Sequence, residues 1–336
     1  MGRAVNGPLR AVRRGVPGLV VLATIGVAAE LIGGAVGFDP LLLAVVIGAV
    51  VANGPGVPAW SRPGVAGHAL LLEVAIVLLG ARLALDELVA VGPRLLGLAV
   101  AAVLAAILLV EGLSRLVTDL DRQGASLLAA GAGICGVSAV AAVATSIDAD
   151  DHVLAYAAAT VVFFDAVTLA VFPVIGSFLG IPARPYGVWV GLAMFSTGPA
   201  TAVGFAAGPT AGVFATLAKL SRNALIGPVV ACYAVVHGRS TGGSAGVVRT
   251  SWSALPRFLV GFVLIVGIAN LGVLSPTALA RIDAVAAGAF LLAFAGLGLS
   301  MSVESIRRTG LGPLVVVGGS LLAVGTLALL VTLALF

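Results

Sequence analysis

The amino-acid sequence predicts an all-α integral membrane protein, and its composition carries this prediction. Hydrophobic residues occupy 60% of the 336 positions, charged residues only 10%, and the mean hydropathy is +1.20. A soluble domain carries roughly 25% charged residues, because water must wet its surface. The 14 acids and 18 bases of this chain cannot coat a globule of this size. Lipid is therefore expected to solvate most of the surface.

Eleven apolar segments, each about as long as a membrane-crossing helix, divide the chain. They lie near residues 17–36, 40–56, 66–85, 95–114, 125–146, 153–180, 186–207, 211–236, 256–275, 282–301 and 311–334. Arginines precede the first segment, as they do in a signal peptide. Its apolar run is long and lacks a clear cleavage site, so it is predicted to be a retained span.

The arginines predict the orientation of these spans. With the N-terminus in the cytoplasm, the cytoplasmic loops contain Arg62, Arg115, Arg122, Arg184, Arg239, Arg249, Arg257, Arg307 and Arg308. The outer loops then contain Arg94, Arg281 and the acidic cluster Asp148, Asp150 and Asp151. This asymmetry follows the positive-inside rule. The sequence therefore predicts a multi-pass protein of the cell membrane, with its N-terminus in the cytoplasm and its C-terminus outside.

Two distant parts of the chain resemble each other. Residues 40–54 read PLLLAVVIGAVVANG, and residues 256–272 read PRFLVGFVLIVGIANLG. Further along, Gly80 matches Gly298 at a distance of 218 residues. Seven predicted spans separate the copies, so they would run in opposite directions, as in an inverted-topology repeat. The alternative is that glycine-rich apolar helices resemble one another by chance.

The echo suggests an organisation along the chain. An N-terminal part, 1–236, would contain the first eight spans, and a Gly-, Ser- and Thr-rich cytoplasmic linker would cover 237–255. The C-terminal part, 256–336, would then contain the last three spans and echo residues 40–114.

Two apolar segments contain residues that interrupt helices. The first has three glycines and a serine within residues 131–138, and the second contains Pro199 within residues 195–201. Proline removes a backbone donor and clashes with the preceding turn. Transporters with inverted repeats place solute sites at such interruptions, where freed backbone groups and helix ends bind ions. The alternative is close helix packing through small residues.

A charged residue inside an apolar segment costs on the order of 2.5–3.5 kcal/mol to insert at the bilayer centre, and three such residues are the leading candidates for a functional role. Asp165 could carry a coupling proton or bind Na⁺. Lys219 and Arg222, one helical turn apart, could neutralise an anionic solute. An internal ion pair between Asp165 and one of these bases is the alternative. Glu30, Glu73 and Glu111 are weaker candidates, the last of them because it lies near a segment end.

Several function classes lack their usual signals. The sequence contains no P-loop and no Gly-x-Ser-x-Gly elbow, its three histidines are scattered, and Cys135 and Cys232 have no metal-ligand spacing. We therefore expect neither an enzyme nor a bound metal or cofactor, apart from Na⁺ or H⁺ as a coupling ion. The expected partners are the lipid bilayer, a small anion and a second copy of the chain, and not nucleic acid.

The runs GAGICGVSAVAAVATSI (131–147) and LAYAAATVVFFDAVTLAVFP (154–173) resemble the YeiH-type sulfate exporter family, a group of UPF0324-like membrane proteins. Matches at 78–88, 219–222 and 294–310 extend the resemblance over most of the chain. This family is similar to the cation–proton antiporter and anion transporter group, which implies a core domain and a panel domain. Two departures stand out: residues 196–203 read STGPATAV where the family has a His-Asp-Thr-Ala-Gln-like run, and Asp165 replaces a glycine.

We therefore expect a secondary transporter that uses an ion gradient to export a small anion such as sulfate. The expected solute site comprises Gly133, Cys135, Gly136, Ser138, Ser196, Thr197, Gly198, Thr201, Lys219 and Arg222, with Asp165 as the ion-coupling residue. The alternatives are a channel or uniporter, a Na⁺- or H⁺-coupled transporter of an organic anion, a membrane-embedded enzyme, and a sensory or structural membrane protein.

Overall fold

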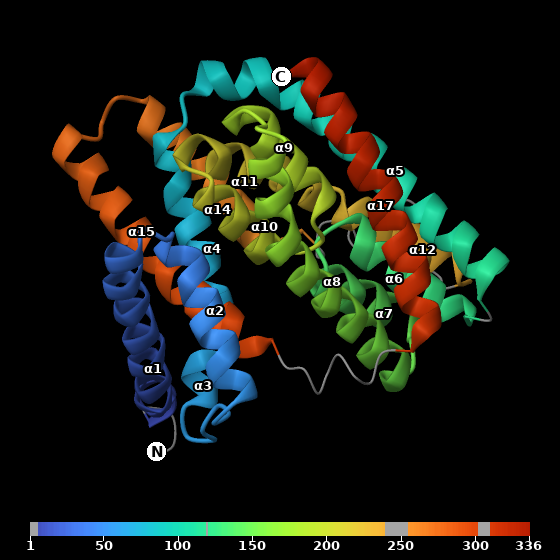
Figure 1. Cartoon of the computed structure of the whole chain (residues 1–336), viewed down its shortest axis with the longest axis horizontal. Coiled ribbons are helices and arrows are strands. Elements are labelled where there is room, and N and C mark those ends of the chain that lie inside the picture. The colour runs from blue at the N-terminus through green and yellow to red at the C-terminus, as the bar shows by residue number, and fades with distance from the viewer. Residues whose placement is uncertain (1–5, 119, 239–254, 302–309) are drawn as a thin grey trace. The chain divides into compact units, whose positions relative to one another are not determined.

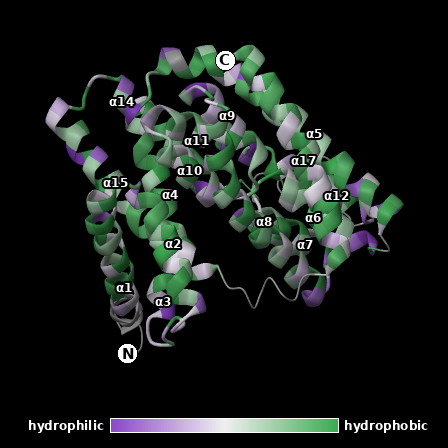
Figure 2. Cartoon of the chain, in the orientation of Figure 1, coloured by the Kyte–Doolittle hydropathy of each residue, from purple (hydrophilic) through white to green (hydrophobic). Residues whose placement is uncertain are grey.

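The computed structural model describes residues 6–118, 120–238, 255–301 and 310–336, and these residues form helices and connections without a strand. Six helices are long and apolar enough to cross a membrane, and shorter apolar helices accompany them. Hydrophilic residues lie mostly at helix ends and in connections (Figure 2). Large apolar side chains are openly exposed, for example Leu31 at 71% and Leu108 at 70%. The chain is a multi-pass helical membrane protein, because such a surface suits lipid rather than water.

The chain forms two compact units, and each combines segments from distant parts of the sequence (Figure 1). The first unit comprises Met1–Leu85 and Gly261–Val303, and the second comprises Asp86–Val260 and Glu304–Phe336. The division into 1–236, 237–255 and 256–336 follows the chain rather than these units. Most of the expected linker lies outside the described residues.

The first unit packs its helices closely through glycine. It contains α1 (Asn6–Val36), α2 (Pro40–Asn53), α3 (Arg62–Val65), α4 (His68–Leu79), the 3₁₀ turn η1 (Gly80–Arg82), most of α14 (Arg257–Asn270) and α15 (Pro276–Ser300). A Cβ atom on Gly48 of α2 would collide with the backbone of α15, and one on Gly298 of α15 with the backbone of α2. These two helices therefore approach backbone to backbone, as small residues allow in membranes.

Two asparagines make matching contacts within the first unit. The Asn53 side-chain amide donates to the Met301 carbonyl at 2.7 Å, and the Asn270 amide donates to the Leu83 carbonyl at 2.8 Å. We call these two residues the asparagine pair. They occupy equivalent positions in the two sequence echoes, and so do the carbonyls that they bind. This correspondence supports the inverted repeat, which stays a prediction.

The second unit contains α5 (Leu85–Val117), α6 (Arg122–Gly133), α7 (Val137–Ile147), α8 (Asp151–Phe178), α9 (Ala183–Ala193), α10 (Thr197–Ala206), α11 (Pro209–Asn223), α12 (Ile226–Val236) and α17 (Leu311–Leu335). In this unit, the long helix α8 packs against four other helices, α6, α7, α10 and α17. The 28 residues of α8 extend about 42 Å at 1.5 Å per residue. The break between α11 and α12 precedes Pro228, whose ring excludes a helical bond to the carbonyl four residues earlier.

Helices α6 and α7 form a hairpin, which we call hairpin 1. The Asp150 backbone N–H, just after α7, donates to the Gln123 side chain at the start of α6, at 3.2 Å. The Tyr156 hydroxyl, near the start of α8, donates to the Asp121 carboxylate just before α6, at 3.0 Å. Both ends of hairpin 1 therefore lie beside the beginning of α8.

Helices α9 and α10 form a second hairpin, which we call hairpin 2. A Cβ atom on either Gly187 of α9 or Gly204 of α10 would meet Ala211 of α11, so both ends of the hairpin lie near the start of α11. A Cβ atom on Gly176, near the end of α8, would meet the Tyr186 ring of α9. Hairpin 2 therefore enters from the end of α8 opposite to hairpin 1.

The prediction that 125–146 and 186–207 cross the membrane is thus wrong, and nine of the eleven segments remain candidate spans. Each hairpin contains two helices of 10 to 12 residues. A broken apolar segment has the same length and composition whether it continues forward or turns back. Periodicity and hydropathy alone do not distinguish these outcomes.

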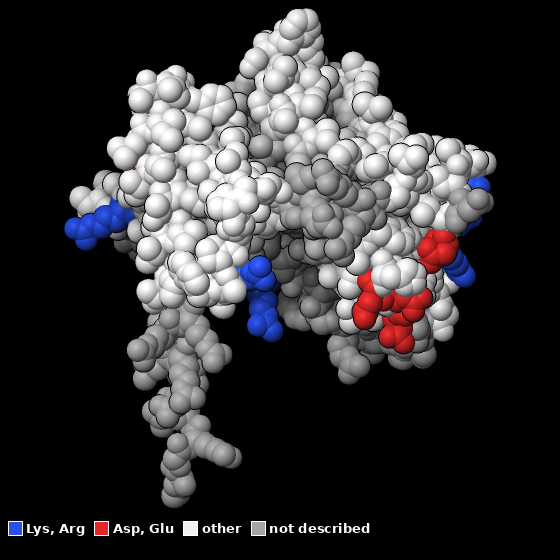
Figure 3. Space-filling view, turned by 60° about the horizontal axis from the view of Figure 1, so that its bottom comes forward, with Lys and Arg blue, Asp and Glu red and all other residues white. Residues whose placement is uncertain are grey.

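The hairpins also correct the sides assigned to two loops. The Arg184 guanidinium lies 5.8 Å from the centre of the Phe336 ring, so Arg184 is on the side of the C-terminus. The acidic residues Asp148, Asp150 and Asp151 lie at the open end of hairpin 1, on the opposite side. The sequence prediction had exchanged these two sides. Because two crossings are lost, the expected sides of the termini are unaffected. Figure 3 shows acidic side chains gathered in one patch on a largely uncharged surface.

Candidate functional site

The tips of the two hairpins meet beside the middle of α8. Tip 1 consists of residues 134–136 and tip 2 of residues 194–196, each between the two helices of its hairpin. A Cβ atom on Gly136 would collide with the Ser196 hydroxyl and approach Val161 of α8. The tips are therefore in contact, each reached from a different end of the second unit.

Each interruption has a local cause. Gly136 has a φ of 72°, a left-handed conformation that a residue with a Cβ adopts only under strain. Pro199 is the third residue of α10, so its ring disfavours a helical turn over the preceding residues. Met194 and Ser196 are extended there, with ψ of 150° and 151°. The two predicted helix interruptions are confirmed.

Lys219 and Arg222 of α11 bind the ends of both incoming helices. The Lys219 ammonium nitrogen donates to the Ile134 and Met194 carbonyls, each at 2.8 Å. Arg222 makes five hydrogen bonds of 2.5–3.0 Å, to the carbonyls of Ala132, Gly133, Leu192 and Met194. Both side chains are fully buried, at 0% and 1% exposure.

These contacts place the positive charges of Lys219 and Arg222 at the C-terminal ends of α6 and α9. The carbonyl ends of α6 and α9 carry the negative poles of the helix dipoles, and the two bases cover them. The N-cap residues of α7 and α10, Gly136 and Ser196, make no side-chain cap bond, and at α10 the Asp165 carboxylate accepts the Ser196 N–H. Val137 and Ser138 in the first turn of α7 are exposed, and Ser196 and Thr197 at the start of α10 are partly exposed. Backbone N–H groups in the first turn of a helix are suited to bind an anion, and at α10 they lie beside the carboxylate of Asp165.

Asp165 of α8 binds tip 2. Its side chain is 4% exposed, and its Oδ1 atom accepts the Ser196 backbone N–H at 3.0 Å. Among the described residues, no lysine or arginine nitrogen lies within 4.0 Å of its carboxylate. Asp165 therefore forms no ion pair at contact distance with Lys219 or Arg222.

The remaining predicted residues differ in what they can reach. Cys135 is buried within tip 1, and Gly198 is buried in the first turn of α10. The Thr201 hydroxyl donates back to the Thr197 and Gly198 carbonyls, so it bonds within its own helix. Ser138 is exposed at the start of α7.

Asn223 is a further residue beside the tips, and the sequence does not single it out. Its side-chain amide nitrogen donates to the Thr197 hydroxyl oxygen at 3.1 Å, which places the amide at the first turn of α10. A neutral residue in an apolar segment gives no charge signal. Its position four residues after Lys219 does place both side chains on one face of α11.

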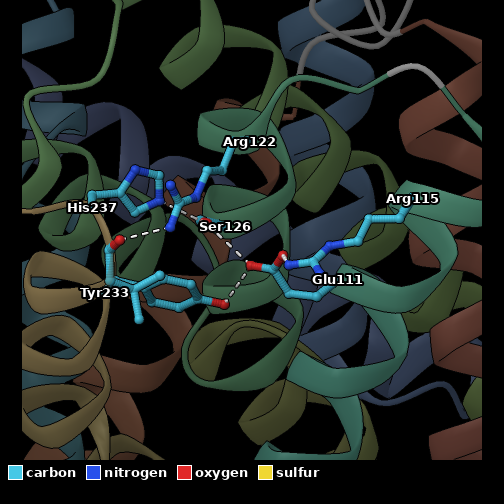
Figure 4. A network of polar contacts seen from close by, with 7 residues as sticks. Glu111, Arg115, Arg122, Ser126, Tyr233 and His237 are labelled. Atoms are coloured by element: carbon cyan, nitrogen blue, oxygen red, sulfur yellow. Dashed lines mark hydrogen bonds and ion pairs between the residues drawn. The ribbon is translucent and has the colours of Figure 1, made fainter.

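A second polar cluster lies at the ends of α5, α6 and α12 (Figure 4). One oxygen of Glu111 accepts the Ser126 hydroxyl at 3.0 Å and the Tyr233 hydroxyl at 3.2 Å, and Ser126 also contacts the His237 ring at 3.1 Å. Arg115 lies 3.6 Å from the other oxygen of Glu111. The sequence treats Glu111 as a residue near a segment end, whereas the structure makes it the centre of this network.

An apolar cavity in the second unit takes no part in the site. Its lining comes from α5, α9 and α17: Leu98, Ala101, Ala102, Ala105, Leu192, Val324, Leu327, Ala328 and Val331. None of the predicted site residues is among them. An alkyl lining offers no polar side chain to hold an anion.

The fold and the site define a class: a multi-pass membrane protein with two opposed helical hairpins whose tips meet inside one unit. Comparison with known proteins places the chain more narrowly. Residues 17–317 match the family model described as conserved hypothetical protein 698. The chain is 30% identical to the UPF0324 membrane protein Atu0671 of Agrobacterium fabrum, over 93% of this chain and 91% of that protein. It therefore belongs to the UPF0324 membrane protein family.

Other relatives extend this similarity. The UPF0324 membrane protein TauZ of Paracoccus denitrificans is 30% identical, over 90% of each chain. A UPF0324 membrane protein of Nitratidesulfovibrio vulgaris is 28% identical, over 90% of this chain and 88% of that protein. No solved structure matches the chain.

Proposed function

We propose that the chain is a secondary transporter of a small anion, driven by an ion gradient and working in the cell membrane. The observation that carries this proposal is the contact between the two tips, where the N-cap residues of α7 and α10 make no side-chain cap bond. Each N-terminus carries roughly half a positive charge from the helix dipole. Lys219 and Arg222 support the site indirectly, by neutralising the opposing helix ends rather than by contacting the solute.

The two hairpins favour alternating access over an open pore. Hairpin 1 enters the second unit from one end of α8 and hairpin 2 enters from the other. Movement of one tip at a time would open the anion site to one side of the membrane and then to the other. A channel would need both tips open together.

In this proposal Asp165 couples the solute to the ion gradient. Its carboxylate holds the backbone of tip 2 directly, so binding of H⁺ or Na⁺ to it would alter that contact. Sulfate is the first anion to test, because the family resemblance implies it.

The test is flux of labelled sulfate and phosphate in proteoliposomes, with and without an imposed pH or Na⁺ gradient. The proposal expects uptake that saturates with anion and rises with one of the gradients. The Asp165→Asn variant should bind anion but lose this gradient dependence. Flux that ignores both gradients would indicate a channel or uniporter, and unchanged coupling in the variant would remove Asp165 from the mechanism.

A further inference from the structure

Asn223 presents an unpartnered acceptor at the start of α10. Among the described residues, four buried side-chain atoms have no hydrogen-bond partner: Ser114 Oγ, Arg184 Nε, the Tyr186 hydroxyl and Asn223 Oδ1. Arg184 and Tyr186 lie at the open end of hairpin 2, and Ser114 lies near the end of α5. Of these residues, only Asn223 contacts the start of α10, directly after tip 2.

The Asn223 amide is held in place by its other atom. Its nitrogen donates to the Thr197 hydroxyl oxygen, and the side chain is 1% exposed. The oxygen shares a carbon with this nitrogen, so it also lies at the first turn of α10. Buried polar atoms in proteins nearly always have a partner, and an unpaired one lowers stability. A partner supplied by a bound solute would remove this penalty.

The N–H donors of α10 and the acceptor oxygen of Asn223 need different groups on a solute. The N–H groups in the first turn of α10, which receive no cap bond from the Ser196 side chain, are donors and attract a negative oxygen. Asn223 Oδ1 is an acceptor and needs an O–H or N–H. A solute that satisfies both must be an anion that also carries a hydrogen-bond donor.

We propose that Asn223 is a specificity-determining residue and that the site takes oxyanions retaining an O–H or N–H in preference to fully deprotonated ones. This inference rests on the proposed anion transport and narrows its substrate class. Ser196 and Thr197, at the start of α10, are partly exposed, so displacement of tip 2 would uncover the amide to the entering solute. Sulfate at neutral pH has no proton to donate, whereas phosphate keeps at least one.

The test compares sulfate with phosphate at pH 8, where both are mainly tetrahedral dianions and differ chiefly in one O–H. Binding to the purified full-length protein is measured from the rise in unfolding temperature with anion concentration. Wild type should bind phosphate about tenfold or more tightly than sulfate, because sites built to bond a donor reject analogues that lack it.

Variants assign that preference to one atom. Asn223→Leu removes the amide at similar size and should bring the phosphate-to-sulfate ratio close to one. Asn223→Thr, which keeps a hydroxyl acceptor, should retain part of it. Tyr186→Phe is the matched control, because it removes a buried unpartnered hydroxyl away from the tips, and it should leave the ratio unchanged.

The outcomes separate this inference from the transport proposal. If neither anion stabilises the protein or crosses the membrane, the proposed function fails. If sulfate binds as well as or better than phosphate in wild type, or Asn223→Leu keeps the ratio, the inference fails while anion transport stands. If Asn223→Leu abolishes a dependence of transport on the Na⁺ gradient and leaves the phosphate-to-sulfate ratio unchanged, the oxygen binds a cation. That result would also overturn the inference.

Discussion

Replacing Arg222 with methionine tests whether the arginine holds the two hairpins together. Methionine is unbranched and fills much of the same volume without donating a hydrogen bond. The substitution removes five hydrogen bonds and leaves the carbonyls of four residues without this partner in a buried place. The effect therefore falls on both hairpins at once.

The expected loss can be worked from these contacts. A hydrogen bond to a charged group contributes about 1.5–3 kcal/mol, but bonds from one side chain do not add fully. Some carbonyls will relax toward other donors, so we expect a loss of about 3–5 kcal/mol. At roughly 2–4 °C per kcal/mol, the unfolding temperature should fall on the order of 10 °C. Arg222→Lys keeps the charge with fewer donors and should lie between wild type and Arg222→Met.

The assay is thermal unfolding of the purified protein in detergent without added anion. Arg115→Met is the control, because Arg115 is 77% exposed and only forms an i,i+4 pair, which contributes about 0.3–0.5 kcal/mol. If Arg222→Met unfolds at the same temperature as this control, the arginine does not hold the two hairpins together.

Three further predictions follow from the same geometry. Gly136→Ala should abolish transport and lower stability by about 1–3 kcal/mol, because Gly136 has a left-handed backbone and a Cβ atom there would collide with tip 2. Gly97→Ala, in open space on α5, is the control and should be neutral or stabilising. Equal effects of the two substitutions would contradict the packed tips. Alanine at either member of the asparagine pair should cost about 1 kcal/mol in thermal unfolding, and clearly unequal losses would argue against equivalent positions. Cysteines at Asp148 and Arg184 should react with an impermeant thiol reagent from opposite sides of the membrane, with the Arg184 position on the side of the C-terminus; the reverse would restore the two crossings.

The sequence predicted much of the fold because lipid imposes a strong compositional rule. Long apolar runs and few charges were enough to identify a helical membrane protein. Glycine and proline also located both interruptions, since their backbone effects are local. The return of each hairpin was not predictable, because it depends on contacts such as that between Gln123 and Asp150.

The site was predicted in its parts but not in its arrangement. Buried charge singled out Asp165, Lys219 and Arg222, and all three do lie at the tips. The expectation that the two bases face the solute differs from the structure, where they bind backbone carbonyls. That role depends on where two helices end in space, which spacing along α11 does not encode. Asn223 was not predicted, because a neutral amide costs less to insert into a membrane than a charged side chain and gives no comparable signal.

Whether the anion binds between the tips can be measured by protection of a cysteine from labelling. Ser138→Cys, in a chain whose Cys135 and Cys232 are replaced by alanine, places a thiol at the exposed start of α7. Thr145→Cys, exposed further along the same helix, is the control. Phosphate or sulfate should slow maleimide labelling at position 138 in a saturable way and leave position 145 unaffected. Labelling at 138 that ignores every transported anion would contradict a solute site at the meeting of the two hairpins.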